Sequence, residues 1–168
     1  QASAGPLEGV IVLDLTRPLA GSFASMMLGD LGAEVINVEP PAAAGAGLMY
    51  TARSAKPDNK SFKGEDVMFL SSYRNKKSLT IDLKAEKGKQ IVYDLTSRVH
   101  VVLDNFRAGV MKRLGADYET LSKINPRIIC CSVTGFGSTG PHCDRPAQVA
   151  PESLAVGADN DVLVFRPE

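Results

Sequence analysis

A short apolar run, a helical segment and a second apolar run constrain the fold of this chain more than any other feature. Residues 10–14 read Val-Ile-Val-Leu-Asp, a pattern typical of a strand that is covered on both faces. We expect a helix over residues 23–31, with Ser22 as its N-cap and Gly32 as the residue that ends it. Glu34–Glu39 predicts a second strand, which completes a βαβ unit of about 30 residues.

Predicted strands and helices continue to alternate along the rest of the chain. Residues 40–63 are rich in Ala, Gly, Pro and Lys without a period, which predicts a long loop. Beyond it we expect a helical turn at 66–72, strands at 79–83, 100–104 and 128–133, and helices at 86–98, 109–114 and 118–125. The alternation predicts an α/β fold: an open, mostly parallel, Rossmann-like sheet with flanking helices and right-handed crossovers.

Three residues with binding chemistry come just after predicted strands. Arg17, Asn105 and Gly135 each follow such a strand closely. Ligands of open α/β sheets bind at the carboxyl ends of the strands. We therefore expect these three residues to lie on the same edge of the sheet.

The composition argues against several classes of function. The chain has 168 residues, enough for one domain with a buried core, and its 19 basic residues balance its 19 acidic residues. A net charge of zero gives no overall field that favours nucleic acid or anionic membranes, and no apolar run approaches the ~20 residues that span a bilayer. Cys130 and Cys131 are adjacent and leave Cys143 unpaired, which favours a reducing compartment over a disulfide framework. Because residue 1 is Gln, we expect a processed or trimmed chain.

Three segments carry residues suited to anionic and acyl ligands. Residues 74–77 read Arg-Asn-Lys-Lys, and both Arg and Lys bind phosphate groups. Residues 17–21 read Arg-Pro-Leu-Ala-Gly and lead into a helix N-terminus, where unpaired N–H groups favour an anion or a carbonyl. Residues 135–140 read Gly-Phe-Gly-Ser-Thr-Gly, a loop whose backbone donors can approach a ligand closely. Taken singly, these segments are also typical of a solvated basic turn, a tight strand–helix connection and a surface loop.

Together, and in the chain order 17–21, 74–77 and 135–140, the three segments resemble the N-terminal half of the family III CoA-transferases, over about residues 6–147. Members of that family transfer CoA from an acyl-CoA to a carboxylic acid. The resemblance implies coenzyme A as a substrate, acyl-CoA and carboxylic acids as partners, and no metal. Full-length members are more than twice as long and form interlocked homodimers. We therefore expect an N-terminal α/β domain over residues 1–147, a divergent tail over 148–168, and a location in the mitochondrial matrix or the cytoplasm.

The resemblance also implies roles for individual residues. We expect nucleotide contacts from Arg74, Asn75, Lys76 and Lys77, contacts to the pantetheine arm and acyl group from Arg17, Leu19 and Ala20, and further contacts from Asn105, Phe106, Arg113, Gly135 and Gly137. Asn105 offers both a donor and an acceptor to the pantetheine amides. Many relatives carry a basic residue directly after the glutamate that ends the second predicted strand. This chain has Pro40 there, which cannot supply the charge.

The catalytic aspartate is the part of the family pattern that this sequence does not match. In the family an aspartate attacks the acyl-CoA thioester and forms a mixed anhydride as the CoA thiolate leaves, and the acceptor carboxylate enters in a second step. That aspartate normally lies well downstream of the glycine loop, and the match ends near Ala147. Asp159 is a weak candidate for the nucleophile because it comes too early in the chain. We therefore expect little or no transfer activity from these 168 residues alone.

The sequence also leaves alternatives to a CoA-transferase. An α-methylacyl-CoA racemase-like enzyme needs paired acid and base groups, but its Gly-His-Asp motif is absent and His142 with Asp144 are the only nearby substitutes. A non-catalytic CoA-binding or assembly fragment would carry the same binding residues without turnover. A generic dinucleotide-binding domain is disfavoured because no Gly-x-Gly-x-x-Gly follows the first predicted strand.

Overall fold

The computed structural model of the protein describes residues 5–17, 20–41, 61–62, 65–66, 71–137, 139, 141–143 and 161–165. Within these ranges one sheet has six strands in the order β5-β2-β1-β6-β7-β8. In chain order they are β1 (Ile11–Asp14), β2 (Glu34–Glu39), β5 (Lys76–Thr80), β6 (Val101–Asp104), β7 (Ile129–Thr134) and β8 (Asp161–Phe165). All neighbours are parallel except β8, which pairs antiparallel with β7. The predicted α/β fold with a mostly parallel sheet is confirmed.

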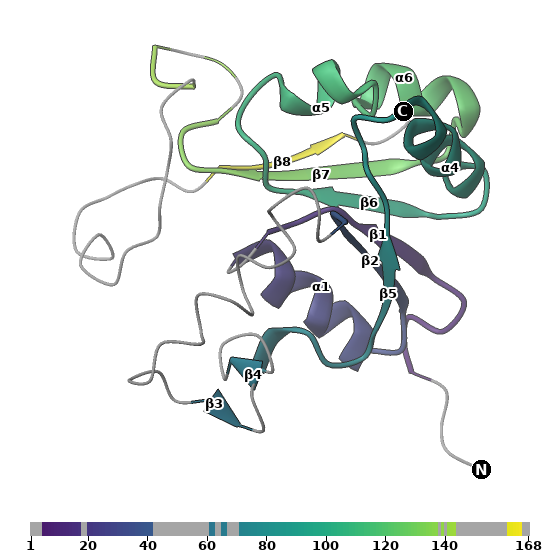
Figure 1. Ribbon diagram of the computed structural model, residues 1–168, viewed down its shortest axis with the longest axis vertical. Helices are drawn as coiled ribbons and strands as arrows, with labels where there is room; N and C mark the ends of the chain where they lie inside the picture. Colours follow the sequence, from purple (N-terminus) through teal and green to yellow (C-terminus); the bar gives the residue numbers. More distant parts are fainter. Residues whose placement is uncertain are drawn as a thin grey trace.

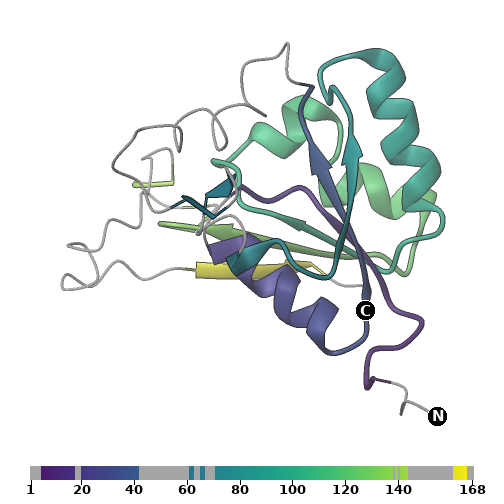
Figure 2. The same ribbon diagram turned by 60° about the horizontal axis from the view of Figure 1, so that its bottom comes forward.

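Helices cover both faces of this sheet. α1 (Ala20–Asp30) lies on one face, whereas α4 (Glu86–Thr96), α5 (Val110–Leu114) and α6 (Tyr118–Ile124) lie on the other (Figure 1). The rotated view in Figure 2 shows the same separation. A separate two-stranded sheet consists of β3 (Ser61–Phe62) and β4 (Glu65–Asp66). Among the helices of the described residues, none is long and apolar enough to cross a membrane.

Alternating side chains of the strands build one apolar core on each face. Val12 packs with Val35 and is joined by Leu28 of α1. The next residue, Leu13, belongs to the opposite core together with Leu121 of α6. Because successive strand residues point to opposite faces, the continuous apolar run of β1 supplies both cores.

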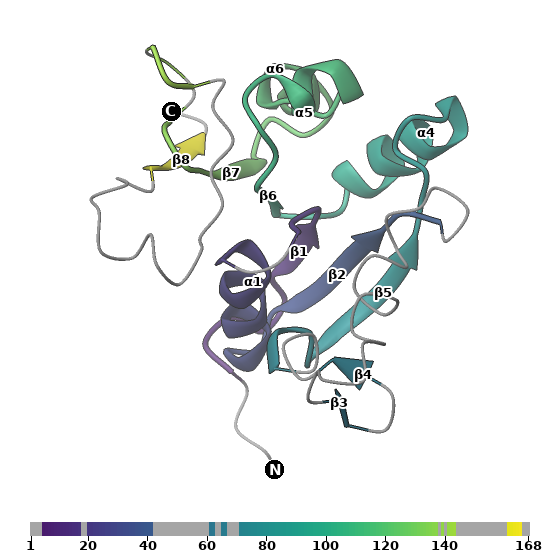
Figure 3. The same cartoon turned by 60° about the vertical axis from the view of Figure 1, so that its left-hand side comes forward.

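The chain changes direction across the sheet at β1. It moves outward from β1 to β2 and then to β5, and after α4 it returns to β6 on the other side of β1 (Figure 3). The carboxyl ends of β1 and β6 therefore flank a topological switch point. Open α/β sheets bind their ligands at such points.

Three predicted boundaries were wrong because tertiary packing decides them. α1 begins at Ala20, so Ser22 is a buried residue of its first turns and not an N-cap. β5 begins at Lys76, because it pairs with β2 from Val35 onward, and the basic segment is partly strand. Asp66 belongs to the short strand β4, where we expected a helical turn to start, whereas residues 71–72 at the end of the expected turn are helical.

The remaining elements lie close to their predicted positions. Gly32 has a φ of 102°, which confirms it as the left-handed residue after α1. The apolar run in the predicted tail forms β8 at the edge of the sheet. Most of the loop expected at residues 40–63 lies outside the described residues.

Candidate functional site

A side chain that follows β6 fixes the loop that follows β1. Asn105 Oδ1 accepts a hydrogen bond from the backbone N–H of Arg17 at 2.6 Å, and Asn105 Nδ2 donates to the Arg17 carbonyl oxygen at 2.6 Å. Gly135 directly follows the neighbouring parallel strand β7. The predicted placement of these three residues at the carboxyl edge is confirmed. The side-chain amide of Asn105, which we expected to contact pantetheine, instead forms these two hydrogen bonds with the loop after β1.

The side chain of Arg17 is a half-buried cation at this edge. Its Nη1 atom donates to the carbonyl oxygen of Val38 at 3.4 Å, and its guanidinium carbon lies 5.9 Å from the centre of the Phe106 ring. Burial lowers the pKa of Arg17. No carboxylate of the described residues forms an ion pair with it. A guanidinium that has lost water without gaining a carboxylate favours an anionic or carbonyl ligand.

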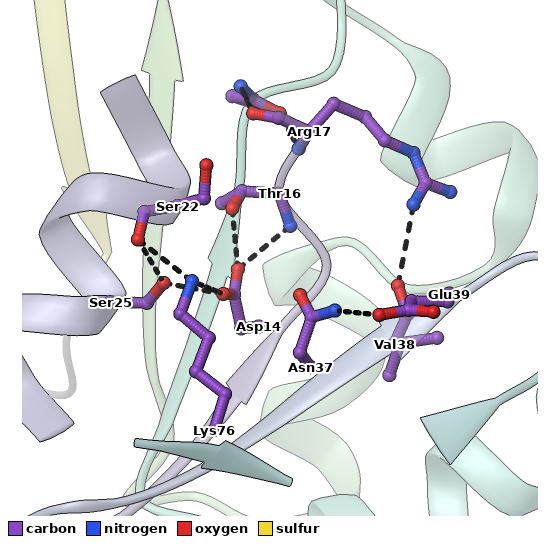
Figure 4. A network of polar contacts seen from close by, with 10 residues as sticks. Asp14, Thr16, Arg17, Ser22, Ser25, Asn37, Val38, Glu39 and Lys76 are labelled. Atoms are coloured by element: carbon purple, nitrogen blue, oxygen red, sulfur yellow. Dashed lines mark hydrogen bonds and ion pairs between the residues drawn. The ribbon is translucent and has the colours of Figure 1, made fainter. Parts of the chain in front are cut away.

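Asp14, the last residue of β1, is fully buried and accepts four hydrogen bonds. Its Oδ1 atom accepts from the Thr16 backbone N–H at 3.0 Å and from the Thr16 hydroxyl at 2.6 Å. Its Oδ2 atom accepts from the Ser25 hydroxyl at 2.5 Å and from Lys76 Nζ at 3.1 Å (Figure 4). A carboxylate inside a protein requires such partners. These contacts make Asp14 a structural hydrogen-bonding residue that connects β1, the loop after it and α1.

Gly21 allows the first turn of α1 to pack against this network. A Cβ atom on Gly21 would lie 2.5 Å from Thr16 Cγ2 and 2.6 Å from Thr16 Cβ. Any larger residue would therefore displace Thr16, whose hydroxyl is bonded to Asp14. The glycine at this position is explained by close packing between the helix and the loop.

Lys76 reaches Asp14 from two strands away. Its side chain is only 2% exposed, and Nζ also donates to the Ser22 carbonyl oxygen at 2.8 Å. The same atom lies 4.6 Å from the centre of the Tyr73 ring. Burial lowers the pKa of Lys76, and the Asp14 carboxylate opposes this shift. The ammonium group faces the interior, whereas the nucleotide contact expected for Lys76 requires an accessible cation.

The rest of the basic segment lies at the opposite, amino edge of the sheet. Arg74 Nη2 is 2.6 Å from Asp30 Oδ2, and Asn75 Nδ2 is 2.6 Å from Asp30 Oδ1, at the end of α1. Lys77 Nζ is 2.7 Å from Glu34 Oε1 at the start of β2. The nucleotide contacts of Arg74, Asn75 and Lys77 stay predictions. A phosphate would compete there with acidic partners.

The loops after β6 and β7 complete this edge. Asp104 is buried and accepts hydrogen bonds from the Ser132 hydroxyl and, at 3.1 Å, from the Phe106 N–H. Burial raises the pKa of Asp104, although both hydrogen bonds oppose the shift. Gly137 has a φ of 78°, a left-handed conformation that glycine adopts without strain. The glycine-rich sequence thus meets a real conformational requirement at Gly137.

Two buried side-chain oxygens near the carboxyl ends have no hydrogen-bond partner within the described part of the chain. They are Asn37 Oδ1 on β2 and Thr134 Oγ1 at the end of β7. Asn37 Nδ2 donates to Glu39 Oε1 at 2.9 Å, so only the oxygen of this amide is unpaired. Unpaired buried oxygens are rare and favour a bound ligand or water nearby. Sequence reasoning missed Asn37, although a polar residue within an apolar strand was an available signal.

Other candidate residues are more dispersed. Ala20 is the exposed first residue of α1, Phe106 lies beside Arg17, and Arg113 is in the last turn of α5. Leu19 and the candidate nucleophile Asp159 lie outside the described residues. Their roles stay predictions.

The paired acid and base that a racemase needs are not seen in the described residues. His142 is exposed and lies edge-on to Phe136, with 6.1 Å between the ring centres. Asp144, its expected companion, is outside the described residues. In the part of the chain that the structure describes, no cluster of three or more His, Cys, Asp or Glu residues could hold a metal ion.

The sheet order and the residues at its switch point define an open α/β domain, a class of fold that binds its ligands at the carboxyl edge of the sheet. The sequence profile of CoA-transferase family III matches residues 7–149. The protein therefore belongs to CoA-transferase family III, and the resemblance found in the sequence is confirmed.

Comparison with individual proteins agrees with this assignment. The chain is 47% identical over 152 residues to succinyl-CoA:glutarate CoA-transferase from Mus musculus, covering 90% of this chain and 33% of that protein. It is 41% identical over 144 residues to acetyl-CoA:oxalate CoA-transferase from Acetobacter aceti, covering 85% and 35%. The crystal structure of a CAIB/BAIF family protein from Brucella suis has a TM-score of 0.74 and 39% identity, covering 85% of this chain and 37% of that chain. The chain spans about a third of the length of the curated relatives it matches.

Proposed function

We propose that this chain is the CoA-binding part of a family III CoA-transferase that moves CoA from an acyl-CoA to a carboxylic acid. The observation that carries the proposal is the Arg17–Asn105 contact at the switch point, inside the segment matched by the family. Relatives named for succinyl-CoA and glutarate support succinyl-CoA as the donor and a dicarboxylate as the acceptor.

In this proposal the thioester end of acyl-CoA lies over the loop between β1 and α1. The Arg17 guanidinium, with Leu19, Ala20 and the first N–H groups of α1, binds the acyl group and the upper part of the arm. The pantetheine arm passes Asn105 and Phe106.

The glycine loop and more distant cations complete the proposed binding. Backbone donors at Gly135 and Gly137 stabilise the developing oxyanion. Arg113 provides a phosphate contact, and Arg74 and Lys77 are the further candidates for one. The site takes coenzyme A as a substrate and uses no metal.

The proposed reaction is covalent catalysis by an aspartate. A carboxylate oxygen attacks the thioester carbon, the C–S bond breaks, and the CoA thiolate leaves a mixed anhydride. The acceptor carboxylate attacks the aspartyl carbonyl of this anhydride, displaces the donor acid as its carboxylate and forms a second mixed anhydride. The CoA thiolate then attacks the acceptor acyl carbon, which forms the new thioester and releases the aspartate carboxylate. We place the nucleophile outside residues 1–147, with Asp159 as a weak candidate.

A transfer assay with succinyl-CoA and glutarate tests this proposal when hydroxylamine is present to trap an acyl-enzyme and CoA binding is measured in parallel. We expect the 168-residue chain to bind CoA with little or no transfer. Transfer that is lost in Asp159→Asn would make Asp159 the nucleophile. Transfer that survives this change would exclude Asp159, and a chain that does not bind CoA would contradict the proposal.

A further inference from the structure

The buried lysine of the basic segment has a position that suits a different task from phosphate binding. We propose that Lys76 is a positioning residue: its ion pair with Asp14 holds the loop between β1 and α1 in the shape that presents Arg17 to the ligand. The inference rests on the proposed function only in naming CoA as that ligand.

The path of the Lys76 side chain supports this role. Its backbone pairs with Val35 near the amino end of β2, yet Nζ lies 3.1 Å from Asp14 Oδ2 and 2.8 Å from the Ser22 carbonyl oxygen. The side chain therefore runs under α1 toward the carboxyl edge (Figure 4). With 2% of the Lys76 side chain and none of the Asp14 side chain exposed, a phosphate could reach Nζ only after the pair had separated.

The Asp14 carboxylate connects the ion pair with Lys76 to the loop between β1 and α1. Its other contacts are with the Thr16 N–H and hydroxyl and with the Ser25 hydroxyl. One ion pair thus joins β5, the end of β1, the residue before Arg17 and the first turns of α1. Removing only the lysine would leave a buried, unpaired carboxylate, and the loop would rearrange to bring water to it.

The two roles predict different effects of Lys76→Met on ligand binding. If Lys76 contacts the 3′-phosphate, its loss should weaken the binding of CoA more than the binding of dephospho-CoA. The same loss should reduce the salt dependence of binding. A positioning residue acts through the loop, which meets the arm and acyl group. Loss of a positioning lysine should therefore weaken the binding of CoA and of dephospho-CoA by the same factor, and leave the salt dependence of binding unchanged.

The experiment compares wild type, Lys76→Met, the double variant Asp14→Asn/Lys76→Met, and Lys89→Met as the control. Lys89 is a surface lysine paired with Glu86 on α4, far along the chain from the loop. Hydrogen exchange at the Thr16 amide reports the loop without any ligand, and calorimetry with CoA and dephospho-CoA reports binding.

In Lys76→Met we expect the hydrogen-exchange rate of the Thr16 amide to rise about ten- to hundredfold, as for the loss of a hydrogen bond to a charged group. The double variant, which buries no unpaired charge, should return protection to within about threefold of wild type, and Lys89→Met should not change it. If Lys76→Met fails to fold, the double variant still decides: it should fold and keep the preference for CoA over dephospho-CoA.

Unchanged Thr16 exchange in Lys76→Met would overturn the inference. A selective loss of CoA binding over dephospho-CoA binding in either variant would also overturn it and make Lys76 a phosphate ligand. A wild-type chain that binds neither ligand would contradict the proposed function, and the exchange measurement would still decide the role of Lys76.

Discussion

Two aspartates end neighbouring strands at the carboxyl edge, and their surroundings differ. Asp14 of β1 is paired with Lys76, whereas Asp104 of β6 forms no ion pair with any cation among the described residues. Asp104 instead accepts hydrogen bonds from neutral groups, and burial raises its pKa. The folded state therefore disfavours the charged form of this carboxyl group.

Replacing Asp104 by Asn should stabilise the protein at neutral pH. Asn keeps an acceptor for the Phe106 N–H and removes the buried charge, so we expect a gain in the free energy of unfolding of about 1–2 kcal/mol at pH 7. Because the folded pKa of Asp104 is raised, wild-type stability falls as pH rises from the unfolded value of about 3.9 through the folded value. The difference in the free energy of unfolding between the variant and wild type should grow as the pH rises between these two pKa values and stay constant above them.

Urea unfolding of both proteins between pH 4 and 8 measures this difference. An advantage that does not change with pH, or a wild type that is more stable at pH 7, would show that the charge on Asp104 is compensated.

Cys130 should be the least reactive of the cysteines. It is buried, and burial raises its pKa to about 12, so at pH 9 roughly one molecule in a thousand carries its thiolate. Cys143 is half-buried. Alkylation with iodoacetamide followed by tandem mass spectrometry should label Cys143 first and Cys130 last, whereas all should react at similar rates in denaturant. Early labelling of Cys130 in the native protein would contradict the packing of β7.

At the scale of the elements, α4 depends on one glycine. Gly88 is buried, and a Cβ atom there would lie 1.9 Å from the backbone oxygen of Asp82. Ala normally stabilises a helix relative to Gly by about 1 kcal/mol. Here the clash is with backbone, so Gly88→Ala should instead lower the free energy of unfolding by about 2 kcal/mol or more.

The matched control for this change is Lys87→Ala, an exposed position on the same helix. Urea denaturation should find the control within about 0.5 kcal/mol of wild type. A Gly88→Ala protein as stable as that control would show that α4 can move away from Asp82 without cost.

Local patterns predicted most of the elements, and tertiary contacts decided the exceptions. The apolar runs of β1, β2, β6 and β7 were visible because each strand is buried on at least one face. The early start of α1 depends on how Gly21 packs against Thr16, and the start of β5 depends on its pairing with β2. Neither contact leaves a signal in the local sequence.

The same distinction explains what could be predicted of the site. Arg17, Asn105 and Gly135 were recognised because each follows a strand, and parallel strands bring their carboxyl ends together. Lys76 could not be separated from Arg74 and Lys77 by sequence, because its partner Asp14 is 62 residues away. Three cations within four positions were therefore interpreted as one cluster, although in the fold each pairs with a different carboxylate.

For the whole molecule, a net charge of zero means that any affinity for an anionic ligand must come from local placement of charge. All three cations of the basic segment form ion pairs with carboxylates, in the interior or at the amino edge. Arg17 differs, because it lies at the carboxyl edge and pairs with a backbone carbonyl. We therefore propose that the acyl and pantetheine parts of CoA bind at the carboxyl edge of the sheet.

Calorimetric titration of CoA into wild type, Arg17→Gln and Arg98→Gln tests this central claim most directly. Arg98 is an exposed arginine that precedes β6 and so lies at the amino edge. We predict that Arg17→Gln weakens CoA binding by about tenfold or more, as for a charge-assisted hydrogen bond, and that Arg98→Gln changes it by less than about twofold. Equal losses in the two variants, or binding that survives Arg17→Gln unchanged, would contradict a CoA site at the carboxyl edge.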